Sequence, residues 1–345
     1  MSPATQTTPP TGGEAPCEQL GLRKVFPPAA PGGPPAYPPL PDMNAHRNAA
    51  GLLAGLLCCL AVSLTAAPIA LADGIFPDKA LEKAVRREVF EKRYNEEPIT
   101  AEDVKNISQV VQEGEGGEDI ESLEGLQHCV SLMLIELPGN KIKDLSPLAK
   151  LNKLQSVDLA DNQIESVEPL AELTNMQYLR LSGNKISDIA PLAKMSNMRA
   201  LYLEGNQIAS IEPVAGMSKI QSLYAGGNKI ESYAAIGNLH WLSSLDLQHG
   251  SVSDLHFLMP LQEIRLLNLS HNDIADLTVL VEMCRADAED RRRFAPYLRL
   301  YISENPVMEK AQADDAVKQQ LERLKAFGVR VNPQPESPAP QQQPQ

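Results

Sequence analysis

Hydrophobic residues along most of the chain follow one repeating frame. In residues 179–192, LRLSGNKISDIAPL, apolar and polar residues alternate up to an asparagine, and the alternation then stops. Alternation over a few residues is typical of a half-buried β-strand, so this stretch predicts a short strand followed by a turn. Equivalent asparagines recur every 22 residues, at Asn140, Asn162, Asn184, Asn206 and Asn228, and the same register continues to Gly250 and Asn272.

Around each asparagine the apolar residues keep fixed positions: eight, five and three residues before it, and two, five and eight after it. In the repeat of Asn184 they are Met176, Leu179, Leu181, Ile186, Ile189 and Leu192. Self-similarity at a fixed period indicates stacked units that bury one continuous core. The next matching asparagine after Asn272 is Asn305, 33 residues on, so 11 residues are inserted in that repeat.

The repeated asparagines are predicted to be structural. A turn that leaves a buried strand contains backbone N–H and C=O groups that no sheet pairs, and each unpaired buried group costs about 1–3 kcal/mol. A side-chain amide carries both donors and an acceptor. Asparagines stacked at one repeat interval therefore form a ladder that satisfies neighbouring turns. Gly250 interrupts this ladder and marks a local weak point.

The pattern LxxLxLxxN, with an isoleucine two residues after the asparagine, resembles the leucine-rich repeats. The 22-residue period and the following DIxPL resemble the internalin-type class of secreted bacterial proteins, over roughly residues 73–332. The resemblance implies an α/β solenoid: a curved array whose strands form a parallel sheet on the concave side. It also implies a helical N-terminal cap and a C-terminal helix cap. The repeat frame leaves the ligand open.

Residues 1–42 are rich in proline and glycine, a composition typical of chains without a packed core. We interpret them as a disordered leader, or as sequence upstream of a true start at Met43.

Residues 43–72 have the order of a signal peptide. A short polar start with Arg47 precedes an uncharged apolar run over 49–72 that ends in the small-x-small sequence Ala70-Leu71-Ala72. Cleavage between Ala72 and Asp73 is predicted, which places the protein in the periplasm, the cell envelope or the medium. The run is also long enough to span a bilayer. An uncleaved membrane anchor is therefore the alternative, and it is the one membrane contact that we expect.

Residues 73–110 are predicted to form a helical cap, because a repeat array closes its open end with an atypical unit. Asp78, and Thr100 with Asp103, fit helix N-caps. The array spans 111–306 and begins with a degenerate repeat, in which the acidic QEGEGGED takes the place of strand and asparagine. Residues 307–332 supply a closing helix and a short strand, and 333–345 form a disordered Pro/Gln-rich tail.

The charge of the chain argues against a nucleic-acid partner. A formal net charge of −13 repels phosphate backbones and anionic lipid. Arg291, Arg292 and Arg293 follow three acids within 286–290, and we interpret this segment as a solvated, self-paired helix or loop.

The sequence contains no nucleophile motif, phosphate-binding loop, HExxH or CxxC. We therefore predict a non-enzymatic protein with no cofactor and no metal. Cys129 takes an apolar frame position and is interpreted as a buried hydrophobe. Cys284 lies seven repeats away, roughly 30 Å or more at the spacing of adjacent strands, too far for a disulfide.

The frame also predicts which side chains are free to bind. Residues six, four and two positions before each asparagine point away from the core, because side chains alternate along a strand. Tyrosine and arginine are enriched at binding hot spots. The predicted ligand-binding residues of the concave face are Tyr178, Arg180, Tyr202, Tyr224, Asp246 and Tyr301. Trp241, the only tryptophan, is either an exposed anchor at the edge of the face or a local edge plug.

These observations predict an exported, monomeric interaction module whose concave face binds another protein, or a glycan. One alternative is a structural spacer of an envelope or matrix. The other is an intracellular regulatory scaffold for an enzyme, which requires residues 43–72 to be something other than an export signal. His249 and His271 both directly precede a position of the ladder register. We interpret them as turn-lining residues rather than as a pH-sensitive or metal-binding pair.

Overall fold

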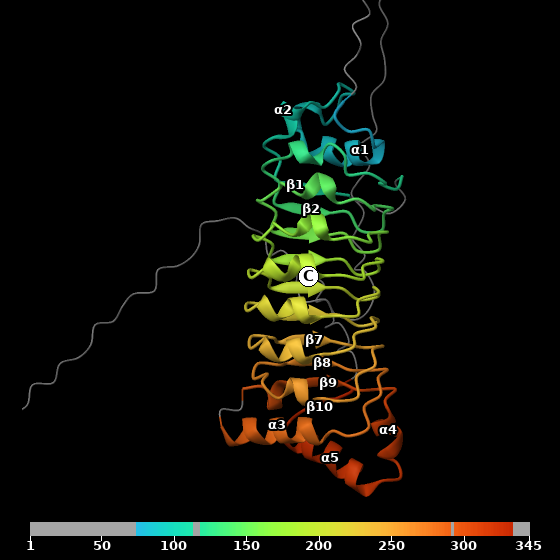
Figure 1. Ribbon diagram of the computed structural model, residues 1–345, viewed down its shortest axis with the longest axis vertical. Helices are drawn as coiled ribbons and strands as arrows, with labels where there is room; N and C mark the ends of the chain where they lie inside the picture. The colour runs from blue at the N-terminus through green and yellow to red at the C-terminus, as the bar shows by residue number, and fades with distance from the viewer. Residues whose placement is uncertain (1–73, 113–117, 291–292, 334–345) are drawn as a thin grey trace, which may run out of the picture. The chain divides into compact units, whose positions relative to one another are not determined.

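A computed structural model describes residues 74–112, 118–290 and 293–333 of the chain. Within these residues, parallel strands form one ten-stranded sheet, in which each strand pairs with the next along the chain (Figure 1). The strands are β1 (Gln109–Val111), β2 (Leu134–Glu136), β3 (Ser156–Asp158), β4 (Tyr178–Arg180), β5 (Ala200–Tyr202), β6 (Ser222–Tyr224), β7 (Ser244–Asp246), β8 (Leu266–Asn268), β9 (Arg299–Tyr301) and β10 (Arg330–Val331). From β2 to β8 each residue pairs with the one 22 positions later, as Leu134 does with Ser156, so the sequence period is the register of the sheet.

Short 3-10 helices return the chain from one strand to the next. In four repeats a proline occupies the first turn of this helix, where its fixed φ is already suited to the helix and its missing N–H is not needed. The 3-10 helices are η1 (Phe90–Lys92), η2 (Leu126–His128), η3 (Ser146–Leu148), η4 (Glu168–Leu170), η5 (Ala190–Lys194), η6 (Glu212–Gly216), η7 (Ala234–Asn238), η8 (His256–Leu258) and η9 (Ala295–Tyr297).

The core lies between the sheet and the return segments. The apolar frame residues fill it, and those of the Asn184 repeat are at most 1 % exposed. Cys129 is fully buried, as predicted, and both Cys129 and Cys284 are free thiols. Burial raises the pKa of each thiol to about 12. The predicted α/β solenoid with a parallel sheet is confirmed.

The asparagine ladder is present in the predicted form. In the Asn206 repeat, the side-chain Oδ1 accepts from the Ile186 N–H (3.0 Å), and Nδ2 donates to the carbonyls of Leu181 and Leu203 (both 2.9 Å). Equivalent bonds join neighbouring repeats at Asn140, Asn162, Asn184, Asn228, Asn272 and Asn305. All seven asparagines are between 2 and 7 % exposed.

The ladder extends one step beyond the sequence prediction. Asn332, which follows β10, accepts from the Ile302 N–H at 2.8 Å. It lies 27 residues after Asn305, so the 22-residue period gave no signal for it. At the interruption, Ile230 is 6 % exposed, whereas its equivalent Ile208 is 1 % exposed. The core is thus slightly more open where Gly250 replaces the ladder residue.

Two helices close the N-terminal end. The Asp78 side chain caps α1 (Lys79–Glu88) by accepting from the Leu81 N–H (2.9 Å), and Thr100 with Asp103 forms a capping box on α2 (Ala101–Val104). The expectation that the acidic segment replaces the first strand is wrong. Strand β1 lies directly before that segment and pairs Gln109 with Leu134, three residues earlier than the 22-residue period predicts.

At the C-terminal end, the inserted residues form α3 (Thr278–Glu289), and α4 (Pro306–Lys310) follows β9. The predicted closing helix is α5 (Asp315–Ala326), and β10 is the predicted short strand. Arg293 is not paired with its neighbouring acids as expected. Its Nη1 donates to Gln262 Oε1 (2.9 Å) and lies 3.8 Å from Glu263 Oε1. Arg291 and Arg292 lie outside the described residues.

Candidate functional site

The open face of the sheet consists of the strand side chains that point away from the core. They are the first and third residues of each strand, since middle residues such as Leu201 are fully buried. Register pairing aligns the third residues of successive strands in one line, which we call the central row: Asp158, Arg180, Tyr202, Tyr224, Asp246, Asn268 and Tyr301. The sheet therefore brings most of the predicted binding residues together.

Three tyrosines form a continuous aromatic contact on the open face, which we call the tyrosine ladder. The rings of Tyr202 and Tyr224 stack with centroids 4.7 Å apart and planes within 12°, and Tyr178 meets Tyr202 at 5.3 Å with a 46° tilt. Such pairs contribute about 0.5–1.5 kcal/mol beyond the area they bury. All three rings are half-buried, so they are fixed in place and still accessible.

Small neighbours allow this arrangement. Tyr202 and Tyr224 are direct register partners, whereas the register partner of Tyr178 is Ala200. The short alanine leaves room for the Tyr178 ring to lean diagonally onto Tyr202. Aromatic side chains are long enough to contact diagonal neighbours on adjacent strands. Burial raises the pKa of all three phenols, that of Tyr202 to about 12, so they stay neutral hydrogen-bonding groups at physiological pH.

One arginine lies beside the tyrosine ladder. Arg180 is in register with Tyr202 on one side and with Asp158 on the other. Its Nη1 is 3.5 Å from Asp158 Oδ2, and its side chain is 45 % exposed. The guanidinium is therefore held by its neighbour without being withdrawn from solvent.

Four carboxylates surround the tyrosines. Glu136 and Asp158 lie on β2 and β3, Glu204 follows β5, and Asp246 ends β7. The pKa of each is raised, in every case chiefly by burial. The charge of Asp158 adds to the rise at Glu136, and that of Asp246 to the rise at Glu204. These carboxylates thus carry negative charge in positions where it is incompletely compensated.

Asp246 is less accessible than the sequence suggests. It is only 7 % exposed, its Oδ1 accepts from the Gln248 N–H (3.0 Å), and its Oδ2 accepts from Asn268 Nδ2 (2.7 Å). Gly226 provides the space, because a Cβ there would stand 3.1 Å from Asp246 Oδ1 and 2.7 Å from the Gln248 carbonyl oxygen. Asp246 therefore stabilises the end of its strand, and its predicted role in binding remains a prediction.

The remaining predicted residues lie apart from the ladder. Tyr301 is half-buried on β9 and in register with Asn268, so Asp246 and Asn268 separate it from Tyr224 in the row. Trp241 lies ahead of β7 and is 64 % exposed. Its role, as an exposed anchor or as a local edge plug, stays a prediction.

His249 and His271 stack on each other, with ring centroids 4.1 Å apart and planes within 13°. Both have left-handed backbone conformations, with φ of 54° and 57°. In four other repeats this turn position is a glycine, such as Gly205 with φ of 66°, and in two it is Asp161 or Glu304, also with positive φ. The two histidines therefore line the turns, as predicted.

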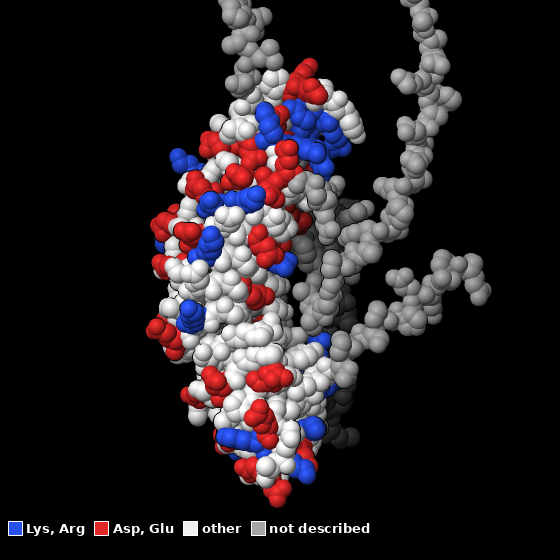
Figure 2. Space-filling view, turned by 90° about the vertical axis from the view of Figure 1, so that its right-hand side faces the viewer, with Lys and Arg blue, Asp and Glu red and all other residues white. Residues whose placement is uncertain are grey.

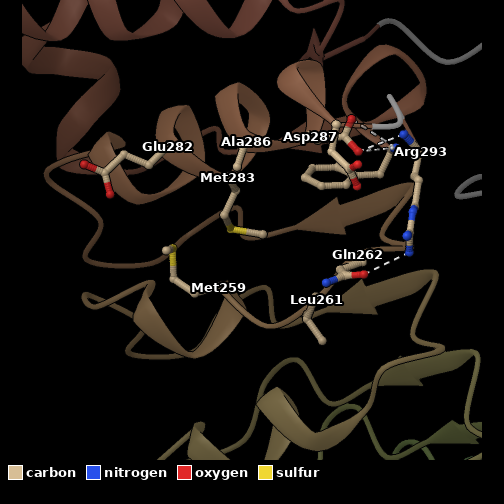
Figure 3. Close-up of a pocket in the computed structure, with 10 residues that line it drawn as sticks. Met259, Leu261, Gln262, Glu282, Met283, Ala286, Asp287 and Arg293 are labelled. Atoms are coloured by element: carbon tan, nitrogen blue, oxygen red, sulfur yellow. Dashed lines mark hydrogen bonds between the residues drawn. The ribbon is translucent and has the colours of Figure 1, made fainter.

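A pocket of about 270 Å³ lies between α3 and the repeat before it (Figure 3). Two of its charged side chains have structural partners: Asp287 accepts from the backbone N–H groups of Arg293 (2.7 Å) and Ala295 (3.0 Å), and Arg293 Nη1 donates to Gln262 Oε1 (2.9 Å). Met259 and Met283 line its apolar side. The pocket therefore lies at the packing contact between the inserted helix and the repeat array.

Charged side chains elsewhere are mixed in sign. On the face that Figure 2 shows, acidic and basic groups interleave and are most crowded toward the N-terminal end. Among the described residues, no group of three or more His, Cys, Asp and Glu side chains is placed to hold a metal ion. No helix in the described ranges is long and apolar enough to cross a membrane. Ala72 and Asp73, the predicted cleavage residues, lie outside these ranges.

Comparison with known proteins agrees with this architecture. Residues 134–172 and 174–216 match the family model described as Leucine Rich repeats (2 copies). An internalin C2 from Listeria monocytogenes shares 33 % identity over 61 % of this chain and 91 % of its own, at a TM-score of 0.56. A leucine-rich repeat protein from Leptospira interrogans has the same TM-score at 17 % identity, over 67 % of this chain and 62 % of its own, and supports the fold alone.

No curated protein sequence matches the chain. The family assignment therefore rests on the repeat frame, on the buried asparagine ladder that it produces, and on the sequence identity with the internalin C2, most of whose length is covered. The chain belongs to the internalin-type family of leucine-rich repeat proteins.

Proposed function

We propose that the protein is an exported, non-enzymatic interaction module that binds a partner protein on the open face of its sheet, the face expected to be concave. The observation that carries this proposal is the tyrosine ladder of Tyr178, Tyr202 and Tyr224. Tyrosine at an interface buries a large area and keeps a polar group for hydrogen bonding.

The geometry of the ladder favours binding for a second reason. A side chain immobilised on association costs about 0.5–1.5 kcal/mol, and these rings are already held by one another and by the strands. Arg180 adds a partly exposed cation directly beside them. The surface is therefore pre-organised, which is the property that converts contact area into affinity.

Export is supported by the signal-like order of residues 43–72. The N-terminal mass of protein recovered from fractionated native cells tests it directly. A species that starts at Asp73 outside the cytoplasm is expected. Intact soluble protein in the cytoplasm would contradict export and favour the intracellular scaffold.

Binding is tested by capture of proteins from the envelope fraction and medium of the same cells, with the wild type and the triple variant Tyr178→Ala/Tyr202→Ala/Tyr224→Ala as baits. We expect a partner that the wild type retains and the triple variant loses. The matched control is Tyr94→Ala/Tyr297→Ala, because these tyrosines are 92 % and 62 % exposed and lie outside the ladder.

Folding of each variant is checked by its unfolding transition. If wild type, triple variant and control retain the same proteins to the same extent, the open face is not a selective binding surface. The structural spacer is then the better description.

A further inference from the structure

The residues that follow the tyrosine ladder in the central row indicate which chemical group the partner presents. The rings of Tyr202 and Tyr224 are parallel within 12° and 4.7 Å apart, which is close to the spacing of adjacent strands. The rings therefore stack along the sheet, and the outer face of Tyr224 is directed toward β7. Its register partner there is Asp246, a short and buried side chain, so the row of stacked rings ends at Tyr224.

At the other end of the tyrosine ladder, the chain itself places a cation next to a tyrosine and an aspartate. There, Arg180 lies between Asp158 and Tyr202 in the row, with its guanidinium 3.5 Å from the Asp158 carboxylate. A cation is thus paired with a buried aspartate and is in register with a tyrosine. At the Tyr224 end the tyrosine and the buried aspartate are both present, but the next residue in the row is the neutral Asn268.

The charges near Tyr224 also favour a positively charged group of the partner. Asp246 and Glu204 each raise the pKa of Tyr224, and Asp246 also raises the pKa of Glu204. Three basic side chains act on these groups. Arg180 is paired with Asp158, Arg299 lies on β9, three strands from Tyr224, and His249, which follows β7, lowers the pKa of Asp246 without cancelling the rise that burial causes. Asp246 and Glu204 are therefore incompletely compensated by the basic groups of this chain. A positive group of a partner would interact favourably with both.

We propose that the partner protein presents an arginine or lysine side chain that pairs with Asp246 against the outer face of Tyr224, as Arg180 pairs with Asp158 in register with Tyr202. This inference rests on the proposed function and names the chemistry of the partner. A cation is attracted to the face of a tyrosine ring, more strongly when it is desolvated, and the aspartate adds a charge-assisted contact.

The test uses a random peptide library displayed on phage, selected on the full-length wild type and counter-selected on the Tyr202→Ala/Tyr224→Ala variant. Enriched peptides are synthesised, and their affinities are measured for wild type, Asp246→Asn and the charge-matched control Glu165→Gln. Asparagine at position 246 keeps an acceptor for the Gln248 N–H, as Asn268 provides one for the Ser270 N–H (3.2 Å), but it loses the acceptor of the Asn268 amide. Folding of this variant is therefore checked by its unfolding transition. Glu165 is exposed and lies outside the strands, in the segment between β3 and η4.

We expect the enriched peptides to share an arginine or lysine at a fixed position, to lose about fivefold to tenfold in affinity with Asp246→Asn, and to be unchanged with Glu165→Gln. Peptides that depend on the tyrosines but lack a shared cation, or that tolerate Asp246→Asn, would overturn this inference and leave the proposed function standing. If Asp246→Asn and Glu165→Gln lower the peptide affinity equally, the effect comes from the net charge of the protein, and the inference is also overturned. If no peptide prefers the wild type over the tyrosine variant, both the inference and the proposed binding face fail.

Discussion

The hydroxyl of Tyr233 occupies the space beside Gly250 into which a side chain would project. A Cβ at position 250 would lie 3.0 Å from that hydroxyl and 3.0 Å from the amide oxygen of Asn272. Tyr233 stands at a frame position where other repeats carry an aliphatic residue, such as Ile211. Its ring stacks on Phe257 at 5.3 Å, and its hydroxyl is hydrogen-bonded with the backbone of Ser251. The tyrosine therefore partly replaces the missing ladder residue.

This relationship predicts that Gly250 and Tyr233 are energetically coupled. Gly250→Asn alone should destabilise the protein by about 1–3 kcal/mol, because the new side chain collides with the tyrosine hydroxyl. Tyr233→Ile alone should also destabilise, since it removes both the ring stack and the bond to Ser251. The double variant restores the frame of the other repeats. Its free energy of unfolding should therefore fall by less than the sum of the two single decreases, with a difference of at least about 1 kcal/mol.

Urea unfolding of the four proteins measures this coupling. As a control, Gly250→Asn combined with the distant core substitution Ile189→Val should be additive within about 0.5 kcal/mol. Additive losses in the Gly250 and Tyr233 pair would show that the tyrosine does not stand in for the asparagine.

The buried asparagine ladder predicts a large and specific loss on truncation. Asn206→Ala leaves the Ile186 N–H without its acceptor, whereas the Leu181 and Leu203 carbonyls keep hydrogen bonds from Asn184 and Asn228. One unsatisfied buried group costs about 1–3 kcal/mol, measurable as a lower free energy of unfolding. The matched control is Asn175→Ala. Asn175 is exposed and bonds only the Asn152 carbonyl (2.8 Å), so a change within about 0.5 kcal/mol is expected there. Equal losses at both positions would contradict the structural role of the ladder.

The two buried thiols are predicted to be inert in the folded protein. Because burial raises the pKa of Cys129 and Cys284 to about 12, only roughly one molecule in ten thousand carries either thiolate at pH 8, and the thiolate is the reactive form. Site-resolved mass spectrometry after iodoacetamide treatment should show slow modification that accelerates together with urea unfolding. Rapid labelling of either cysteine without urea would mean that its repeat opens locally.

The sequence predicts the repeated part of this fold well, because one spacing sets strand register, core positions and the ladder together. It fails where the period breaks. Strand β1 is displaced by three residues, and Asn332 continues the ladder at a spacing of its own. On the open face, alternation correctly places Tyr202 and Tyr224 in one row. The lean of Tyr178 and the burial of Asp246 depend on Ala200 and Gly226, and such neighbour sizes are not visible in a single-residue pattern.

The carboxylates of the open face predict an unusual dependence of stability on pH. Burial and the charge of Asp158 raise the pKa of Glu136, so folding favours its protonated form. Its contribution to stability is then full below the pKa of an unfolded glutamate, about 4.3, and is lost as the pH rises through the higher pKa of the folded state. Glutamine resembles the protonated form. Glu136→Gln should therefore raise Tm by about 1–2 °C at pH 7, and the gain should vanish below about pH 4.

Glu82 provides the opposite case within the same chain. Burial works against its ionised form, but hydrogen bonds from Lys79 and Arg86 outweigh burial and hold its pKa below the usual value. Its stabilising contribution is present above the unfolded pKa and is lost as the pH falls through the lower folded value. Glu82→Gln should therefore lower Tm at pH 7, and its difference from wild type should also shrink in acid. Thermal unfolding of wild type and both variants between pH 3.5 and 7 compares the two signs. A Glu136→Gln variant that is less stable than wild type at pH 7 would show that the open face compensates its carboxylates without a bound cation.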